Sequence, residues 1–303
     1  LLSALPLRTR SRLVSTDGEF HTLARQLARL REEGLEVVLV PARPVETLAE
    51  RLAAAVDART AAALVSSVLF ETAEIVPQLG HLAETCERHG AVLLVDAYHH
   101  LNVVPFDLTG LGLERAFVTG GGYKYCQLGE GNAFLRVPAG CRLRPVLTGW
   151  YAEFDALERG GPRERVAYAA GAGAFAGATY DPTAHYRAAA VFDFHVTQGL
   201  TPERLRAISR HQVGRLEEGI LDLGLDPAVA APVPMPAERR AGFLAVRAPD
   251  AERLTARLRE RGVRVDHRGT ILRLGPAPYL SDRQLDDAVA AFADAVGAAS
   301  GRE

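Results

Sequence analysis

The sequence has few cysteines and no long apolar run. Only three of its 303 residues are cysteine (Cys86, Cys126 and Cys141), and no two of them form a Cys-x-x-Cys pair. A disulfide framework is therefore excluded, and a reducing, cytoplasmic location is expected. The longest apolar runs, such as residues 91–95, are far shorter than the ~20 residues that a membrane-spanning helix needs.

An excess of charge of either sign is also missing. The 35 Lys and Arg residues nearly balance the 37 Asp and Glu residues, which are interspersed with them, so no basic stripe favours nucleic acid. No Gly-x-Gly-x-x-Gly follows an early strand and no Gly-x-x-x-x-Gly-Lys-Ser/Thr occurs, which leaves a nucleotide-binding protein as the least supported reading. A content of 48% hydrophobic and 24% charged residues is typical of a globular protein, and the length predicts about two domains.

The sequence opens on the apolar stretch 1–5 without an initiator methionine. This stretch predicts the tail of a helix whose start lies outside the sequence. We therefore expect that an N-terminal portion precedes residue 1.

Strand-like and helix-like segments alternate through the first half. Residues 91–95 are apolar throughout, as expected of a strand that is covered on both faces. We predict strands at 12–16, 35–40, 62–68, 91–95, 116–119 and 133–137, and helices at 20–31, 45–56 and 79–89. The predicted fold class is α/β, with a mostly parallel sheet sandwiched by helices.

The second half predicts a smaller α+β unit. Thr201 before Pro202 has the pattern of a helix N-cap followed by proline in the first turn. We predict helices at 186–198, 202–223, 249–261 and 281–296, and strands at 242–246, 263–265 and 271–273. The predicted domains are a large domain at 1–199 and a small C-terminal domain at 200–303.

Two residues with suitable chemistry follow predicted strands of the first half. Asp96 comes directly after the apolar strand, and Lys124 comes after residues 117–118 and the triplet Gly120-Gly121-Gly122. Ligands of open α/β sheets bind outside the carboxyl ends of the strands. A lysine there can attack a carbonyl carbon, and an aspartate can hold a protonated ring nitrogen, which is how enzymes use pyridoxal 5'-phosphate (PLP). Taken singly, such residues are more often a helix cap and a solvated side chain.

Three motifs together resemble the class V aminotransferase superfamily of fold-type I PLP enzymes. They are Asp96-x-x-His99, the segment 122–125 (Gly-Tyr-Lys-Tyr) and Gly149-Trp150, and they occur in this order. The kynureninase-like branch is the nearest match, and the resemblance extends from about residue 12 to about residue 285. It implies PLP as the cofactor and a small-molecule amino acid as the substrate.

The resemblance implies a role at the cofactor for five residues. Lys124 would form the internal aldimine and carry protons, and Asp96 would pair with the pyridine nitrogen. His99 would contact the cofactor region. Tyr123 would hydrogen-bond the phosphate, and Phe20 would stack on the ring.

The resemblance also implies a homodimer and a substrate pocket. Trp150 would reach the phosphate in the partner subunit, with residues 129–132 also contributing to the interface. Arg273 would bind the substrate carboxylate, because a guanidinium binds a carboxylate with two parallel hydrogen bonds. Glu153 and Thr179 stand in the substrate pocket where kynureninases carry His and Asn.

Further departures from the family leave the reaction open. Gly121 and Gly122 replace a hydroxyl residue that usually precedes the Tyr-Lys pair, and the phosphate-binding loop of the family would precede residue 1. Residues 265–270 contain no cysteine, which disfavours a cysteine desulfurase, and the pair His99-His100 is too little to predict a metal site. We expect a transaminase, or kynureninase-like hydrolase or lyase chemistry. The alternative is a non-catalytic relative that serves as a binding or scaffold subunit.

Overall fold

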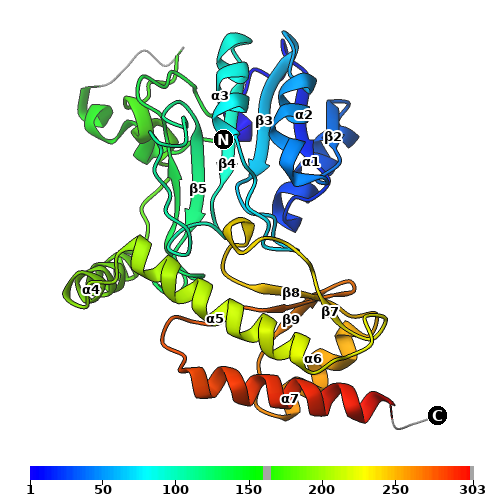
Figure 1. Ribbon diagram of the computed structural model, residues 1–303. Helices are drawn as coiled ribbons and strands as arrows, with labels where there is room; N and C mark the ends of the chain where they lie inside the picture. The colour runs from blue at the N-terminus through cyan, green and yellow to red at the C-terminus, as the bar shows by residue number, and fades with distance from the viewer. Residues whose placement is uncertain (160–164, 301–303) are drawn as a thin grey trace. The chain divides into compact units, whose positions relative to one another are not determined.

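The computed structural model describes residues 1–159 and 165–300 and contains two compact units (Figure 1). The first unit consists of Leu1–Ser67, Val76–Tyr98 and Asp107–Val191. The second consists of Val68–Ile75, His99–Phe106 and the chain from Phe192 onward. Two short segments of the first half thus belong to the second unit. The domain boundary that the sequence predicts between residues 199 and 200 stays a prediction.

A six-stranded sheet forms the centre of the first unit. Its strand order is β2-β1-β3-β4-β5-β6, and all neighbours are parallel except β5 and β6, which are antiparallel. The strands are β1 (Arg12–Thr16), β2 (Glu36–Val40), β3 (Thr60–Ser66), β4 (Val92–Asp96), β5 (Phe117–Gly121) and β6 (Ala133–Arg136). This architecture confirms the predicted α/β class with a mostly parallel sheet.

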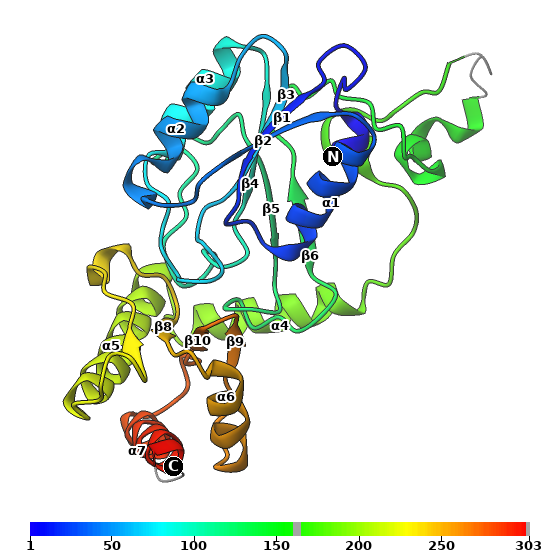
Figure 2. The same cartoon turned by 90° about the vertical axis from the view of Figure 1, so that its right-hand side faces the viewer.

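Helices cover both faces of this sheet. Figure 2 shows α1 (His21–Glu32) on one side, and α2 (Leu48–Ala55) and α3 (Leu79–Arg88) on the other. In a right-handed crossover, the direction in which the chain crosses the sheet decides which face its helix covers. The chain moves one way from β1 to β2 and the other way from β2 to β3 and β4, so α1 lies on the opposite face from α2 and α3. The strand order therefore reverses at β1, and the loops after β1 and β3 lead to helices on opposite faces.

The rest of the first unit contains short helical turns, of which only the one within residues 1–5 has a predicted counterpart, the tail of a helix. A 3-10 turn, η1 (Leu2–Ala4), opens the chain, and η2 (Val45–Thr47) replaces the start of the helix predicted at 45–56. The 3-10 segments η3 (Trp150–Arg159) and η4 (Gly171–Phe175) have no predicted counterpart, because single 3-10 turns carry little apolar periodicity. The unit ends within α4 (Thr183–Thr197).

The second unit is built on a four-stranded antiparallel sheet of order β7-β8-β10-β9. Its core joins buried residues of the sheet, such as Leu244 and Leu272, to residues of the helices, such as Leu216, Leu258 and Phe292. The strands are β7 (Ala231–Pro232), β8 (Leu244–Arg247), β9 (Asp266–Arg268) and β10 (Ile271–Leu274), and the helices are α5 (Pro202–Asp222), η5 (Ala237–Arg239), α6 (Ala251–Glu260) and α7 (Asp282–Ser300). No helix in the described part of the chain is long and apolar enough to cross a membrane.

The strand predicted at residues 263–265 is wrong. The edge strand β9 begins at Asp266, and it is joined to β10 by a tight turn in which Gly269 has a φ of +53°. Because that turn is so short, the strand lies directly before it, with Arg268 opposite Ile271. Val263 and Val265 pack against the core of the unit instead.

Candidate active site

Asp96 is the last residue of β4, and its side chain lies near that of Lys124, which follows β5. Its Oδ1 accepts a hydrogen bond from the backbone N–H of Tyr98 at 2.9 Å. Burial raises the pKa of Asp96, while that hydrogen bond and the positive charge of Lys124 act to lower it. The two residues that the sequence predicts as the centre of the site are therefore brought within electrostatic reach of each other.

Lys124 is the only lysine in the chain. The sequence contains 35 Lys and Arg residues, and all the others are arginine. This count was not used in the sequence analysis, although it is a strong signal. An arginine stays protonated and cannot act as a nucleophile, so a lone lysine at a strand end has a chemical use that no arginine supplies. The ammonium group lies over the ring of Tyr123, 5.2 Å from its centroid.

A tyrosine that the sequence analysis missed explains the glycine at position 121. The ring of Tyr98 lies 5.7 Å from that of Tyr123 and packs directly on Gly121. A Cβ atom at position 121 would lie only 2.6 Å from Cζ and Oη of Tyr98. The hydroxyl residue that the family usually carries before the Tyr-Lys pair is therefore excluded at Gly121 by this ring.

We predict that Gly121→Ala lowers the free energy of unfolding by about 1–3 kcal/mol, the usual cost of forcing an extra carbon into a packed site. Gly177→Ala is a matched control, because a Cβ there meets no atom within 4 Å. Denaturant unfolding of both variants measures the difference. In a Tyr98→Ala background the Gly121→Ala change should cost little, since the clash is removed. An equal cost in both backgrounds would contradict this explanation.

Glu19 is a second carboxyl group at the same end of the sheet, and the sequence analysis did not find it. It lies in the loop between β1 and α1 and is 4% exposed. Its Oε1 accepts the backbone N–H of Ser66 at 2.9 Å, and its Oε2 accepts the hydroxyl of Ser66 at 2.6 Å. Burial raises the pKa of Glu19 to about 7; the hydrogen bonds from Ser66 oppose this rise, and the charge of Asp96 adds to it.

The remaining predicted residues of the first unit lie in other segments. Phe20 directly precedes α1 and is partly buried, with its ring 5.4 Å from that of His21. Trp150 is half exposed and stacks in an aromatic group at the start of η3. Glu153 lies at a break in η3, where φ is −130°, and Thr179 is exposed.

His99 and Arg273 belong to the second unit, where both contact Phe243. The His99 ring lies 6.1 Å from the Phe243 ring, and the Arg273 guanidinium lies 5.4 Å from the centroid of the same ring. Arg273 is only 9% exposed, and its Nε donates to Asp266 Oδ1 at 2.7 Å while its Nη2 donates to Oδ2. Its Nη1 donates to the carbonyl of Phe70. The arginine that was predicted to bind a carboxylate thus already holds one, from the neighbouring strand.

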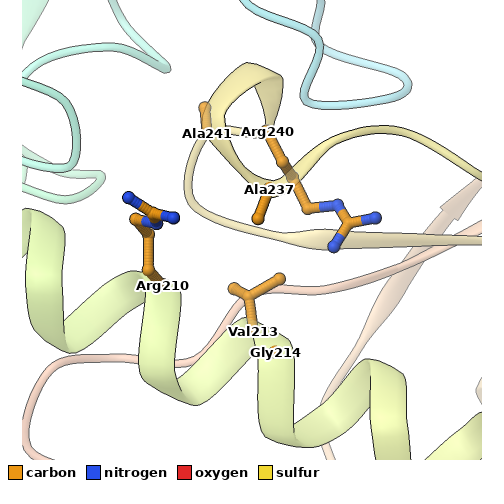
Figure 3. Close-up of a pocket in the computed structure, with 6 residues that line it drawn as sticks. All are labelled: Arg210, Val213, Gly214, Ala237, Arg240 and Ala241. Atoms are coloured by element: carbon orange, nitrogen blue, oxygen red, sulfur yellow. The ribbon is translucent and has the colours of Figure 1, made fainter.

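A small hollow in the second unit contains none of the predicted site residues (Figure 3). Val213 and two alanines form much of its wall, and Arg210 and Arg240 stand at its sides. Each arginine has an acidic partner: Arg240 binds both carboxylate oxygens of Glu217 at 2.5 and 2.6 Å, and Arg210 binds Glu238 at 2.8 Å. We assign no chemistry to this hollow, because its charges are paired and it holds no nucleophile.

The neighbour of His99, His100, is a structural residue. It is 4% exposed, its Nε2 contacts the carbonyl of Pro105 at 3.3 Å, and burial lowers its pKa to about 4. Among residues 1–159 and 165–300, no group of three or more His, Cys, Asp and Glu side chains could hold a metal ion.

Comparisons with known proteins show the fold. The complex of the cystine C-S lyase C-DES with cysteine persulfide matches with a TM-score of 0.78 and 18% identity, over 96% of this chain and 78% of that one. The apo cysteine desulfurase of Thermococcus onnurineus NA1 (TM-score 0.78, 16% identity) covers 98% and 76%. The S-sulfonic acid form of the Escherichia coli cysteine desulfurase CsdA matches with a TM-score of 0.78, 15% identity and the same coverage.

The fold is therefore that of the class V aminotransferases, within fold-type I of the PLP enzymes. Residues 205–292 also match the family model of the kynureninase C-terminal domain. No curated protein matches the sequence. The predicted resemblance is confirmed at the level of the fold, and residues 205–292 are similar to the C-terminal domain of kynureninase.

Proposed function

We propose that this chain is a PLP-dependent enzyme that acts on an α-amino acid, with transaminase or kynureninase-like hydrolase or lyase chemistry. The observation that carries the proposal is the proximity of the only lysine in the sequence, Lys124, to the partly buried Asp96 at the carboxyl ends of β4 and β5. Bound PLP supplies an electron sink for bonds at the substrate α-carbon. A carboxylate and an amine at neighbouring strand ends are the donor set that this cofactor requires.

Each of the two residues has a distinct task. The Lys124 amine holds the aldehyde carbon of the cofactor and moves the proton at the substrate α-carbon. Asp96 keeps a proton on the pyridine nitrogen. Burial makes its negative charge costly, and a cation beside it removes that cost, so Asp96 favours the protonated ring.

Four other residues complete the cofactor site in this proposal. Phe20 stacks on the ring, Tyr123 binds the phosphate, His99 contacts the cofactor region, and Trp150 reaches the phosphate in the partner subunit. Tyr123 and Trp150 are 44% and 50% exposed.

Arg273 is the proposed group for the substrate carboxylate. Its present partner, the carboxylate of Asp266, supports the proposal because it has the same chemistry as that ligand. Glu153 and Thr179 are proposed to select the substrate side chain. A carboxylate at position 153 favours a cationic or hydrogen-bond-donating side chain over a plain aryl ketone.

We also propose that the enzyme is a cytoplasmic homodimer. Large apolar side chains are exposed on residues 146–154 and along α4. They are Val146, Leu147, Trp150, Phe154, Tyr186, Phe192, Phe194 and Val196. A second copy of the chain would bury such surfaces.

The visible absorption spectrum with added PLP tests the proposed function. We expect a band for the wild-type protein and also for Asp96→Asn, which keeps the lysine. Asp96→Asn should nevertheless lower turnover roughly 10²-fold or more, because the ring nitrogen loses the group that keeps it protonated. A small effect would mean that the nitrogen has another partner. Absence of a band in the wild type would favour the scaffold subunit.

A further inference from the structure

Glu19, in the loop after β1, is hydrogen-bonded to β3, the strand that pairs with β4 and its last residue, Asp96. Its carboxyl oxygens accept both the N–H and the O–H of Ser66, at 2.9 and 2.6 Å. Ser66 is the last residue of β3, and it lies opposite Asp96 in the parallel pairing of β3 and β4. Ser67, the next residue, donates from its backbone N–H to the carbonyl of Asp96 at 2.8 Å. Glu19 thus binds the strand next to the one that carries Asp96, the proposed partner of the pyridine nitrogen.

The topology makes this position functionally significant. The loops after β1 and β3 lead to helices on opposite faces, since the strand order reverses at β1. Open α/β sheets bind their ligands outside the carboxyl ends of the strands, at such a reversal point. Glu19 lies in the first of these loops and bonds to Ser66, the last residue of β3 before the second. Phe20, which is proposed to stack on the cofactor, directly follows Glu19 in the chain.

The surroundings of Glu19 contain no compensating cation. Within the described residues, its carboxyl bonds only to Ser66 on β3, and no Arg, Lys or His forms an ion pair with it. Asp96 on β4 faces it with a like charge, and Lys124 acts on Asp96 in turn. His21, at the start of α1, contacts the Phe20 ring. Glu19 and Asp96 therefore act on each other with like charges, and the ammonium group of Lys124 acts on Asp96.

We propose that Glu19 is a positioning residue of the cofactor site, and that it loses a proton when a cation occupies the place beside Asp96. This inference rests on the proposed function. Without a cofactor, burial and the charge of Asp96 favour the protonated carboxyl. A protonated ring nitrogen hydrogen-bonded to Asp96 would cancel that charge directly, whereas the Lys124 ammonium acts on it only from nearby. Glu19 would then ionise, and its proton would pass to the buffer. By reciprocity, ionised Glu19 strengthens the binding of the cation.

The raised pKa of Glu19, at about 7, places this coupling near neutral pH. We therefore expect a specific pH dependence of PLP binding. Glu19→Gln keeps both hydrogen bonds to Ser66, because its amide oxygen accepts the N–H and its amide nitrogen donates to the hydroxyl, but it cannot ionise. Near pH 5.5, well below that pKa, the variant and the wild type should bind PLP equally. Near pH 8.5 the wild type should bind about tenfold more tightly.

The test is a titration of the wild type, Glu19→Gln and Glu84→Gln with PLP across this range, followed by absorbance. Glu84→Gln is the matched control, because Glu84 is an exposed carboxyl on α3 and its loss should leave the affinity unchanged at every pH. Calorimetry near pH 6 in two buffers of different ionisation enthalpy should show that the wild type releases more protons on binding than Glu19→Gln.

Each outcome decides a separate point. If the wild type binds no PLP at any pH, the proposed function itself fails. If PLP binds but the affinity ratio of wild type to Glu19→Gln is the same at every pH, Glu19 is merely structural and this inference fails alone. Should Glu19→Gln not fold, Ser66→Ala replaces it. Loss of the hydroxyl donor should then move the midpoint of the pH dependence upward, and an unmoved midpoint would overturn the proposal.

Discussion

Lys124→Ala is expected to abolish both the visible absorption band with PLP and the covalent attachment of the cofactor. Reduction of the wild-type mixture with borohydride should add one pyridoxyl group to the peptide that contains Lys124. Since the chain has no other lysine, a labelled side chain identifies the site without ambiguity. Turnover should fall roughly 10³-fold or more, because the covalent and the proton-transfer functions are lost together.

The matched variant is Lys124→Arg, which keeps the positive charge near Asp96 but offers no nucleophilic amine. It should retain the fold and remain unlabelled, and mass spectrometry of the intact chain with circular dichroism measures both properties. Peptide mapping separates label on Lys124 from label on an N-terminal amine. A Lys124→Ala protein that keeps its band and its turnover would contradict the mechanism.

Glu19→Gln is expected to change the pH dependence of stability strongly. Burial raises the pKa of Glu19 from 4.5 to about 7. Below the lower value both the folded and the unfolded chain carry the proton, so folding is not penalised. As the pH rises to about 7, the unfolded chain loses the proton while the folded one keeps it, and stability falls. Above that pH the ionised carboxyl stays buried and the full cost remains.

The size of this cost is on the order of 3 kcal/mol, from the pKa difference and the free energy per pKa unit. The difference in unfolding free energy between Glu19→Gln and the wild type should therefore rise by that amount, in favour of the variant, from about pH 4.5 to about pH 8. Denaturant unfolding at both pH values measures it, with Glu84→Gln expected to show no such change. A difference that is independent of pH would mean that Glu19 is ionised in the folded protein throughout this range.

The architecture of the first unit could be predicted because each strand and helix has its own pattern. The apolar run at 91–95 and the glycine at position 90 place β4 and the end of α3 to within a residue. The 3-10 segments η3 and η4 were not predicted, and the helix predicted at 45–56 begins with a 3-10 turn instead. Their conformations depend on packing that no local pattern contains.

The candidate site was predictable only where one residue carries its own signal. Asp96 and Lys124 each follow a strand, so their positions alone suggest chemistry. Glu19 is different: its importance depends on β1 lying beside β3 and on β3 lying beside β4, and strand order cannot be seen in a local pattern. The pairing of Asp266 with Arg273 was missed for a similar reason. The predicted strand ended at residue 265, one residue before Asp266, so Asp266 was not placed opposite a residue of the neighbouring strand.

The fold holds the carboxylate of Asp266 next to Arg273. That carboxylate therefore competes with any dissolved carboxylate for the guanidinium group. Opposite each other on adjacent strands, the two side chains meet at an effective concentration that a dissolved ligand does not easily reach. The Nε and Nη2 edge of the guanidinium belongs to Asp266, and Nη1 also donates to a carbonyl. A ligand must therefore approach the outer edge between Nη1 and Nη2, or else displace Asp266. Selectivity at Arg273 follows from the direction of approach as well as from charge.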